Sequence, residues 1–87
     1  MDSVNEVRRK RLLAFMRRHG IGNRELARIL DRAHSAVAYW RSGKRSVPDH
    51  TMALLEQTAR TGELERAIQE TRATGRRGTL LDNVAGR

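Results

Sequence analysis

Residues 23–43 decide the fold, and they read NRELARILDRAHSAVAYWRSG. Two short stretches of helically spaced apolar residues, at about 23–30 and 34–42, are joined here by the three residues 31–33. Two helices joined by so short a turn form a helix-turn-helix, which we expect at about residues 23–42. The side chains expected to pack between its two helices are Leu26, Ala27, Leu30, Val37 and Trp40.

The flanking sequence predicts three further helices and lacks the alternating apolar pattern of strands. A first helix would begin at the capping box formed by Ser3 and Glu6 and end before Gly20. A fourth would begin at Pro48, which suits the first turn of a helix, and a fifth would cover residues 63–74. Apolar residues at helical spacing give these helices their inner faces: Leu12, Phe15, Met16, Met52, Leu55, Ala59, Leu64, Ala67 and Ile68. The expected fold is all-α, with five short helices.

The length of 87 residues limits the chain to one domain, which we expect over residues 1–74, followed by a tail over 75–87. The net charge is +8, and it is unevenly distributed. Residues 1–47 hold twelve Lys and Arg against four Asp and Glu, whereas residues 48–87 hold six of each kind. The excess charge therefore lies in the half that contains the helix-turn-helix, which favours a polyanionic partner there.

The loop after the second helix of this pair carries a further pattern. Residues 42–48, SGKRSVP, follow Val37 and Trp40. They look like the loop that connects the third and fourth helices in one family of helix-turn-helix proteins. With them, the stretch from 20 to 48 resembles the lambda-repressor/Cro-like (XRE-type) helix-turn-helix family, and the resemblance covers about residues 5–73. It implies a five-helix lambda-repressor-like domain that binds double-stranded DNA, of the small phage or mobile-element regulator type.

Three positions in the turn depart from the family pattern. Asp31 stands where the family has glycine, and aspartate tolerates the left-handed conformation better than most residues. Arg32 stands at an apolar position, which its methylene groups can cover while the guanidinium reaches solvent. Ala33 replaces a Ser-type helix cap, whose loss costs about 1 kcal/mol.

If the second helix of the motif lies in the major groove, one of its faces meets the bases. That face carries the residues at relative positions i, i+1, i+4, i+5 and i+8: His34, Ser35, Ala38, Tyr39 and Ser42. It holds no Arg or Gln, so we expect DNA shape to supplement direct base recognition. The residues expected to contact phosphates surround this helix or open the preceding one: Asn23, Arg24, Arg32, Arg41, Lys44 and Arg45.

Other classes of function find little support in the sequence. No serine has a placed histidine and carboxylate, and no glycine-rich phosphate loop precedes a helix, so we expect no enzymatic activity. The chain has no cysteine, and His19 and His50 lack further ligands at metal spacing, so we expect neither a metal nor a cofactor. No apolar run approaches the length of a membrane span, and we expect a cytoplasmic protein. The basic run at residues 8–11 is either a solvated surface or a second DNA contact.

The resemblance implies a sequence-specific transcriptional regulator, with a repressor that binds an inverted-repeat operator, such as its own promoter, as the favoured form. We expect a homodimer formed through the fourth or fifth helix. Leu80, Leu81 and Val84 would support that dimer, unless the tail is a frayed end. Two alternatives stay open: an antitoxin that binds DNA and a partner toxin, and a DNA-packaging or other helical assembly subunit.

Overall fold

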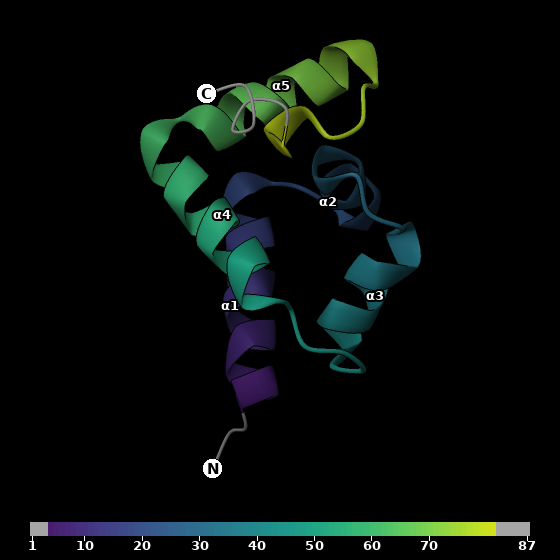
Figure 1. The fold of residues 1–87 in the computed structure, drawn as a ribbon, viewed down its shortest axis with the longest axis vertical. Coiled ribbons are helices and arrows are strands. Elements are labelled where there is room, and N and C mark those ends of the chain that lie inside the picture. Colours follow the sequence, from purple (N-terminus) through teal and green to yellow (C-terminus); the bar gives the residue numbers. More distant parts are fainter. Residues whose placement is uncertain (1–3, 82–87) are drawn as a thin grey trace.

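The computed structural model describes residues 4–81, and the ribbon in Figure 1 shows them as an assembly of short helices. Five α-helices follow one another: α1 (Val4–His19), α2 (Asn23–Leu30), α3 (His34–Ser42), α4 (Asp49–Thr61) and α5 (Glu63–Thr74). Residues 79–81 are helical again after a short connection. The described range contains no strand, so the prediction of an all-α fold is confirmed.

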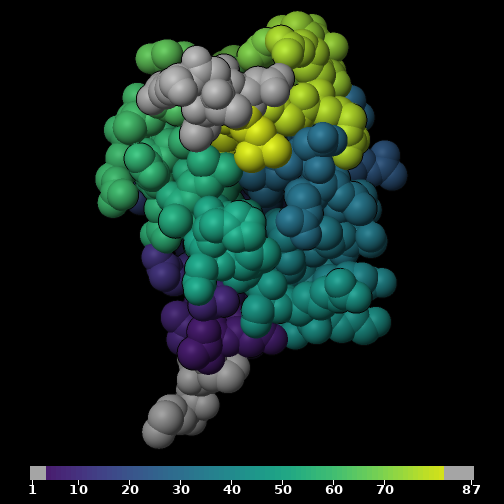
Figure 2. All heavy atoms as spheres, viewed as in Figure 1, coloured from purple at the N-terminus to yellow at the C-terminus, as the bar shows by residue number. Residues whose placement is uncertain are grey.

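The core lies where the inner stripes of the helices meet. α2 contacts both α3 and α5, while α1 contacts α3 and α4 contacts α5. Leu12 of α1, Leu55 of α4 and Ile68 of α5 are fully buried. The residues expected between α2 and α3 are buried as well: Leu26, Ala27, Leu30, Val37 and Trp40. Figure 2 shows how closely the helices pack over one face, with the first turns of α1 extending beyond the others.

The turn between α2 and α3 depends on Asp31, which adopts a left-handed backbone with φ 53° and ψ 48°. Its N–H donates to the Arg28 carbonyl at 3.1 Å, and the Arg32 N–H donates to the Ala27 carbonyl at 2.8 Å. These two bonds satisfy carbonyls that the end of α2 would otherwise leave open. Ala33 is extended and gives α3 no side-chain cap, because it has no hydrogen-bonding group to offer.

The chain beyond α5 belongs to the core, whereas the sequence predicts a domain that ends at residue 74. Thr79 is buried, and its hydroxyl lies 2.7 Å from that of Thr71 in α5. The same hydroxyl donates to the Ala67 carbonyl at 3.2 Å. Leu80 is fully buried in the hydrophobic core. The domain therefore extends to the end of the described range.

This packing changes what the tail offers to a partner. Leu80 is unavailable for the dimer contact expected of it, because it already packs inside its own chain. Leu81 is 40% exposed, while Val84 and the expected cap at Ser3 lie outside the described residues. Within residues 4–81, α4 and α5 expose no large apolar side chain. The apolar side chains that these two helices leave accessible are small or half-buried, such as Ala53 and Leu54.

Candidate nucleic-acid interface

The two sides of α3 differ in exposure. Val37 and Trp40 face the core and are 0% and 2% exposed. The side chains predicted to contact bases lie on the other side: His34, Ser35, Tyr39 and Ser42 are exposed, and Ala38 is half-buried. We call these five residues the outer face of α3. Their spacing in the sequence is what brings them onto one surface of the helix.

Two cations flank the ring of Tyr39 at the C-terminal end of α3. Lys44 Nζ lies 5.3 Å from the ring centroid and Arg45 Cζ lies 5.5 Å from it, both within the range of a cation–π interaction. The Arg45 N–H donates to the Tyr39 carbonyl at 3.2 Å, so the loop folds back onto the helix. Lys44 and Arg45 are themselves exposed. This Tyr39 cluster therefore places two positive charges beside the outer face.

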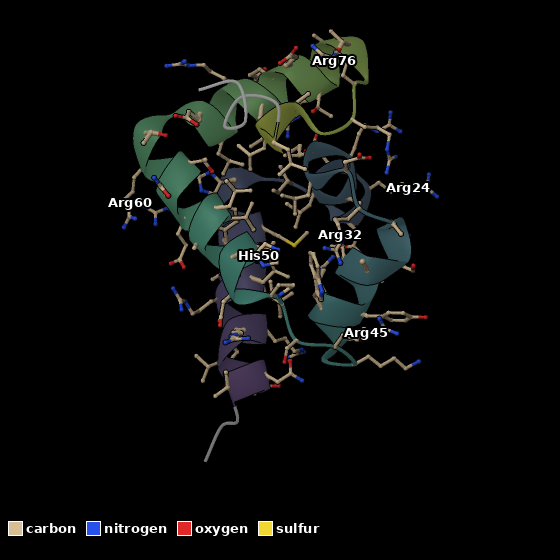
Figure 3. All side chains as sticks on the ribbon, viewed as in Figure 1. Arg24, Arg32, Arg45, His50, Arg60 and Arg76 are labelled. Carbon is tan, nitrogen blue, oxygen red and sulfur yellow. The ribbon has the colours of Figure 1, made fainter. Side chains whose placement is uncertain are left out.

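Arg24 and Arg32 supply positive charge near the N-terminal end of α3. Arg24 is exposed and forms no hydrogen bond or ion pair with other described residues. The guanidinium of Arg32 lies over the ring of Trp40, 5.3 Å from its centroid, and covers the buried indole while remaining exposed. In Figure 3, Arg24 and Arg45 project from the side formed by α2 and α3, whereas Arg60 projects from the opposite side of the bundle.

Two residues predicted to contact phosphates are bonded to each other. Arg41 donates to Asn23 Oδ1 at 2.5 Å, which connects the end of α3 to the start of α2. The pair therefore fixes the two helices relative to one another. A guanidinium has five N–H donors, so Arg41, which is exposed, still has donors for a phosphate.

The hydroxyl of Ser42 is engaged at the end of α3. It donates to the Tyr39 carbonyl at 3.2 Å and accepts from the Lys44 N–H at 3.4 Å. A base contact by this hydroxyl would compete with both bonds. Its geometry therefore favours a structural role over the predicted base contact.

The arginines of the basic run at residues 8–11 are engaged in contacts within the protein. Three of its arginines form ion pairs: Arg8 with Asp49, Arg9 with Glu6 and Arg11 with Glu56. Arg8 and Arg9 also donate to the carbonyls of residues 47 and 41, at 3.2 and 2.8 Å. These contacts attach α1 to α4, to the end of α3 and to the loop that follows α3. They favour a supporting role for the run over a second DNA contact.

A basic pocket of about 260 Å³ lies at the junction of α2, the turn and the start of α3. The side chains that line it are Arg24, Ala27, Arg28, Arg32, His34 and Arg77. Arg28 and Arg77 are absent from the residues predicted to bind DNA. Arg77 follows α5 in the sequence, so only the tertiary structure brings it to α2. An Arg-Arg pair beside a glycine, at residues 76–78, is the one sequence signal that marks it.

Arg72 of α5 forms hydrogen bonds with α2 and with the residues that precede it. Its guanidinium donates to both carboxylate oxygens of Glu25, at 2.8 and 3.0 Å, and to the Gly20 carbonyl at 3.1 Å. The hydrogen bond and the charge of Glu25 raise the pKa of Arg72. Because Glu25 is paired in this way, its negative charge is offset and does not oppose the cations around α3.

Comparison of the chain with family models, curated proteins and solved structures gives no match. Within residues 4–81, no group of three His, Asp or Glu side chains is placed to hold a metal ion. In the same range, no helix is long and apolar enough to cross a bilayer. The case for a function therefore depends on the surface around α3.

Proposed function

We propose that the protein is a sequence-specific regulator that binds double-stranded DNA through a helix-turn-helix formed by α2 and α3, in the manner of lambda-repressor/Cro-like proteins. The observation that carries the proposal is the outer face of α3, which holds no Arg, Lys, Asp or Glu and is flanked at both ends by exposed cations. Arg24 and Arg32 stand at one end, and Lys44 and Arg45 at the other. Cations so placed suit the two phosphate backbones that border a major groove.

In this proposal the outer face of α3 enters the major groove, with the start of the helix nearest the bases. His34 and Ser35 are then the hydrogen-bonding groups for base edges, and the methyl group of Ala38 suits a thymine methyl. Tyr39 bonds a base or a phosphate through its hydroxyl. Because no bidentate Arg or Gln is present, part of the specificity comes from the shape of the duplex.

A homodimer on an inverted repeat suits this mode of binding, because one α3 can make few base contacts and two half-sites double their number. Bound over a promoter, such a dimer acts by steric exclusion, as a repressor. Among the exposed large apolar side chains of residues 4–81, Leu81 is the one closest to α5 in the sequence.

Fluorescence anisotropy with two duplexes tests the proposal. One duplex carries the DNA upstream of the protein's own gene and the other carries the same bases in scrambled order, each measured at two salt concentrations. We expect tighter binding to the upstream duplex and a loss of affinity for both as salt rises. Lys44→Ala should weaken binding to both duplexes, whereas Arg60→Ala, on the opposite side of the bundle, should leave it unchanged. Equal affinity for the two duplexes would refute a sequence-specific regulator.

A further inference from the structure

The basic pocket gathers five basic side chains around one hollow. Arg24 and Arg28 come from α2, Arg32 from the turn, His34 from the first position of α3, and Arg77 from the segment after α5. The lining contains no carboxylate, and the nearby Asp31 is paired with Arg77 at 2.9 Å. The four guanidinium charges in this one hollow repel one another, and a bound anion relieves that repulsion.

The arginines of the pocket are held in place and still have free donors. Arg28 donates one terminal nitrogen to the Gly75 carbonyl at 2.8 Å. Arg77 donates Nε to Asp31 and a terminal nitrogen to the Arg32 carbonyl at 3.1 Å. Each guanidinium has five N–H groups, so both keep donors for the oxygens of a phosphate. Their planar, fixed geometry suits bidentate binding of such a group.

The segment after α5 is fixed against this pocket by its backbone. The Gly78 N–H donates to the Arg28 carbonyl at 2.7 Å. Gly78 has φ 69°, and a Cβ atom there would lie 3.4 Å from Cβ of Asp31, so a side chain would be both strained and crowded. Residues 75–78 therefore lie directly on the end of α2, which is what carries Arg77 into the pocket.

The start of α3 adds a second attraction for an anion. Ala33 gives this helix no side-chain cap, so the first N–H groups of α3 are left without a side-chain acceptor. Free N–H groups and the positive end of the helix dipole both favour a phosphate at this point. His34 belongs to the pocket and to the outer face of α3 at once.

We propose that the basic pocket is a phosphate-binding site, completed by Arg77, that takes one backbone phosphodiester of the duplex bound by α3. This assignment rests on the proposed function, and it makes the segment after α5 part of the DNA-binding surface. DNA is favoured over a free phosphate ion because the pocket shares His34 with the face that meets the bases. A duplex docked on α3 therefore brings its backbone to the pocket.

The first test removes the charge of Arg77. Arg77→Ala should lower the slope of log K against log salt concentration by about one, the value for one lost phosphate contact. Arg66→Ala is the matched control, since Arg66 is exposed on α5, pairs with no other described residue and does not line the pocket. Its slope should equal that of the unchanged protein. If Lys44→Ala lowers the slope and Arg77→Ala does not, the pocket assignment fails while the proposed function stands. If the unchanged protein binds no duplex, both fail.

A double-mutant cycle separates phosphate binding from a merely structural ion pair. Asp31→Asn keeps a residue that tolerates the left-handed turn but frees Arg77 from its carboxylate. We expect duplex affinity to rise about two- to fivefold, the range that corresponds to a surface ion pair. In an Arg77→Ala background the same substitution should give a gain of a different size, because no guanidinium is then released to the phosphate. An equal gain in both backgrounds, or a loss in both, would overturn the assignment.

A third experiment tests whether the pocket binds a phosphate of DNA or a free phosphate ion. Inorganic phosphate is titrated into the protein without DNA, and the amide resonances of His34 and Gly78 are followed by NMR. We expect only small, unsaturated shifts at millimolar phosphate. Saturation at submillimolar concentration, abolished by Arg77→Ala, would assign the pocket to a free anion and overturn its assignment to DNA.

Discussion

Leu80 lies beyond the last complete helix, yet none of its surface is exposed. Leu80→Ala removes the larger part of a side chain that packs in the common core with residues of the other helices. Buried leucine-to-alanine substitutions cost about 3–5 kcal/mol, because the lost transfer free energy adds to that of the cavity left behind. We expect about 3 kcal/mol here, since the end of the described helical stretch has some freedom to relax.

That loss is large for a chain of this size. A domain of about 80 residues has a free energy of unfolding of roughly 4–12 kcal/mol, so the substitution removes a quarter or more of it. The midpoint of thermal unfolding should fall by about 12–24 °C. Urea unfolding, followed by the fluorescence of Trp40, gives the free energy of unfolding of the unchanged protein and of the Leu80→Ala variant. Trp40 is a suitable probe because it is the single tryptophan of the chain and is 2% exposed.

Leu81→Ala is the matched control for this experiment. Leu81 is the next residue along the chain and is 40% exposed, so its truncation should change the free energy of unfolding by less than about 0.5 kcal/mol. Equal effects of the two substitutions, or a loss below about 1 kcal/mol at Leu80, would contradict the packing of residues 79–81 into the core.

Three further predictions concern the turn and the proposed DNA-binding surface. Lys44→Ala and Arg45→Ala should each weaken duplex binding regardless of sequence and lower the salt slope by about one, whereas unchanged slopes in a salt series would remove the Tyr39 cluster from the interface. Ala33→Ser should add the missing cap of α3 and raise the free energy of unfolding by about 1 kcal/mol, and chemical denaturation that shows no gain would mean that its hydroxyl does not reach the helix. Asp31→Val should lower the free energy of unfolding by at least about 1–2 kcal/mol, because a β-branched residue resists φ 53°, and an unaltered midpoint would show that the turn adopts another conformation.

Local signals in the sequence predict the helices well. The expected ranges at 23–30, 34–42 and 63–74 coincide with α2, α3 and α5. Gly43 and Gly62 mark helix ends by the left-handed backbone that each adopts. Such signals act within a few residues, so they can be recognised without any knowledge of tertiary contacts.

The contacts that the sequence does not predict all join distant segments. Arg77 reaches the pocket through a fold that brings residues 75–78 against α2. The fold brings Arg11 of α1 to Glu56 of α4, and nothing in their spacing in the sequence indicates the pairing. The outer face of α3 could be predicted because all of its residues belong to one helix. The pocket could not, because it is completed by Arg77, which lies far from α2, the turn and α3 in the sequence.

The contacts by which α1 holds the end of α3 have a consequence for the proposed recognition of DNA. Asn5 donates to the Gly43 carbonyl at 2.9 Å and Arg9 to the Arg41 carbonyl at 2.8 Å, so α3 is fixed before any partner arrives. A helix preorganised in this way loses little conformational entropy on association and has little freedom to adapt to a poorly fitting groove. If α3 binds DNA as proposed, the duplex has to make the adjustment, and the stiffness of base steps that the protein never touches becomes part of the selectivity.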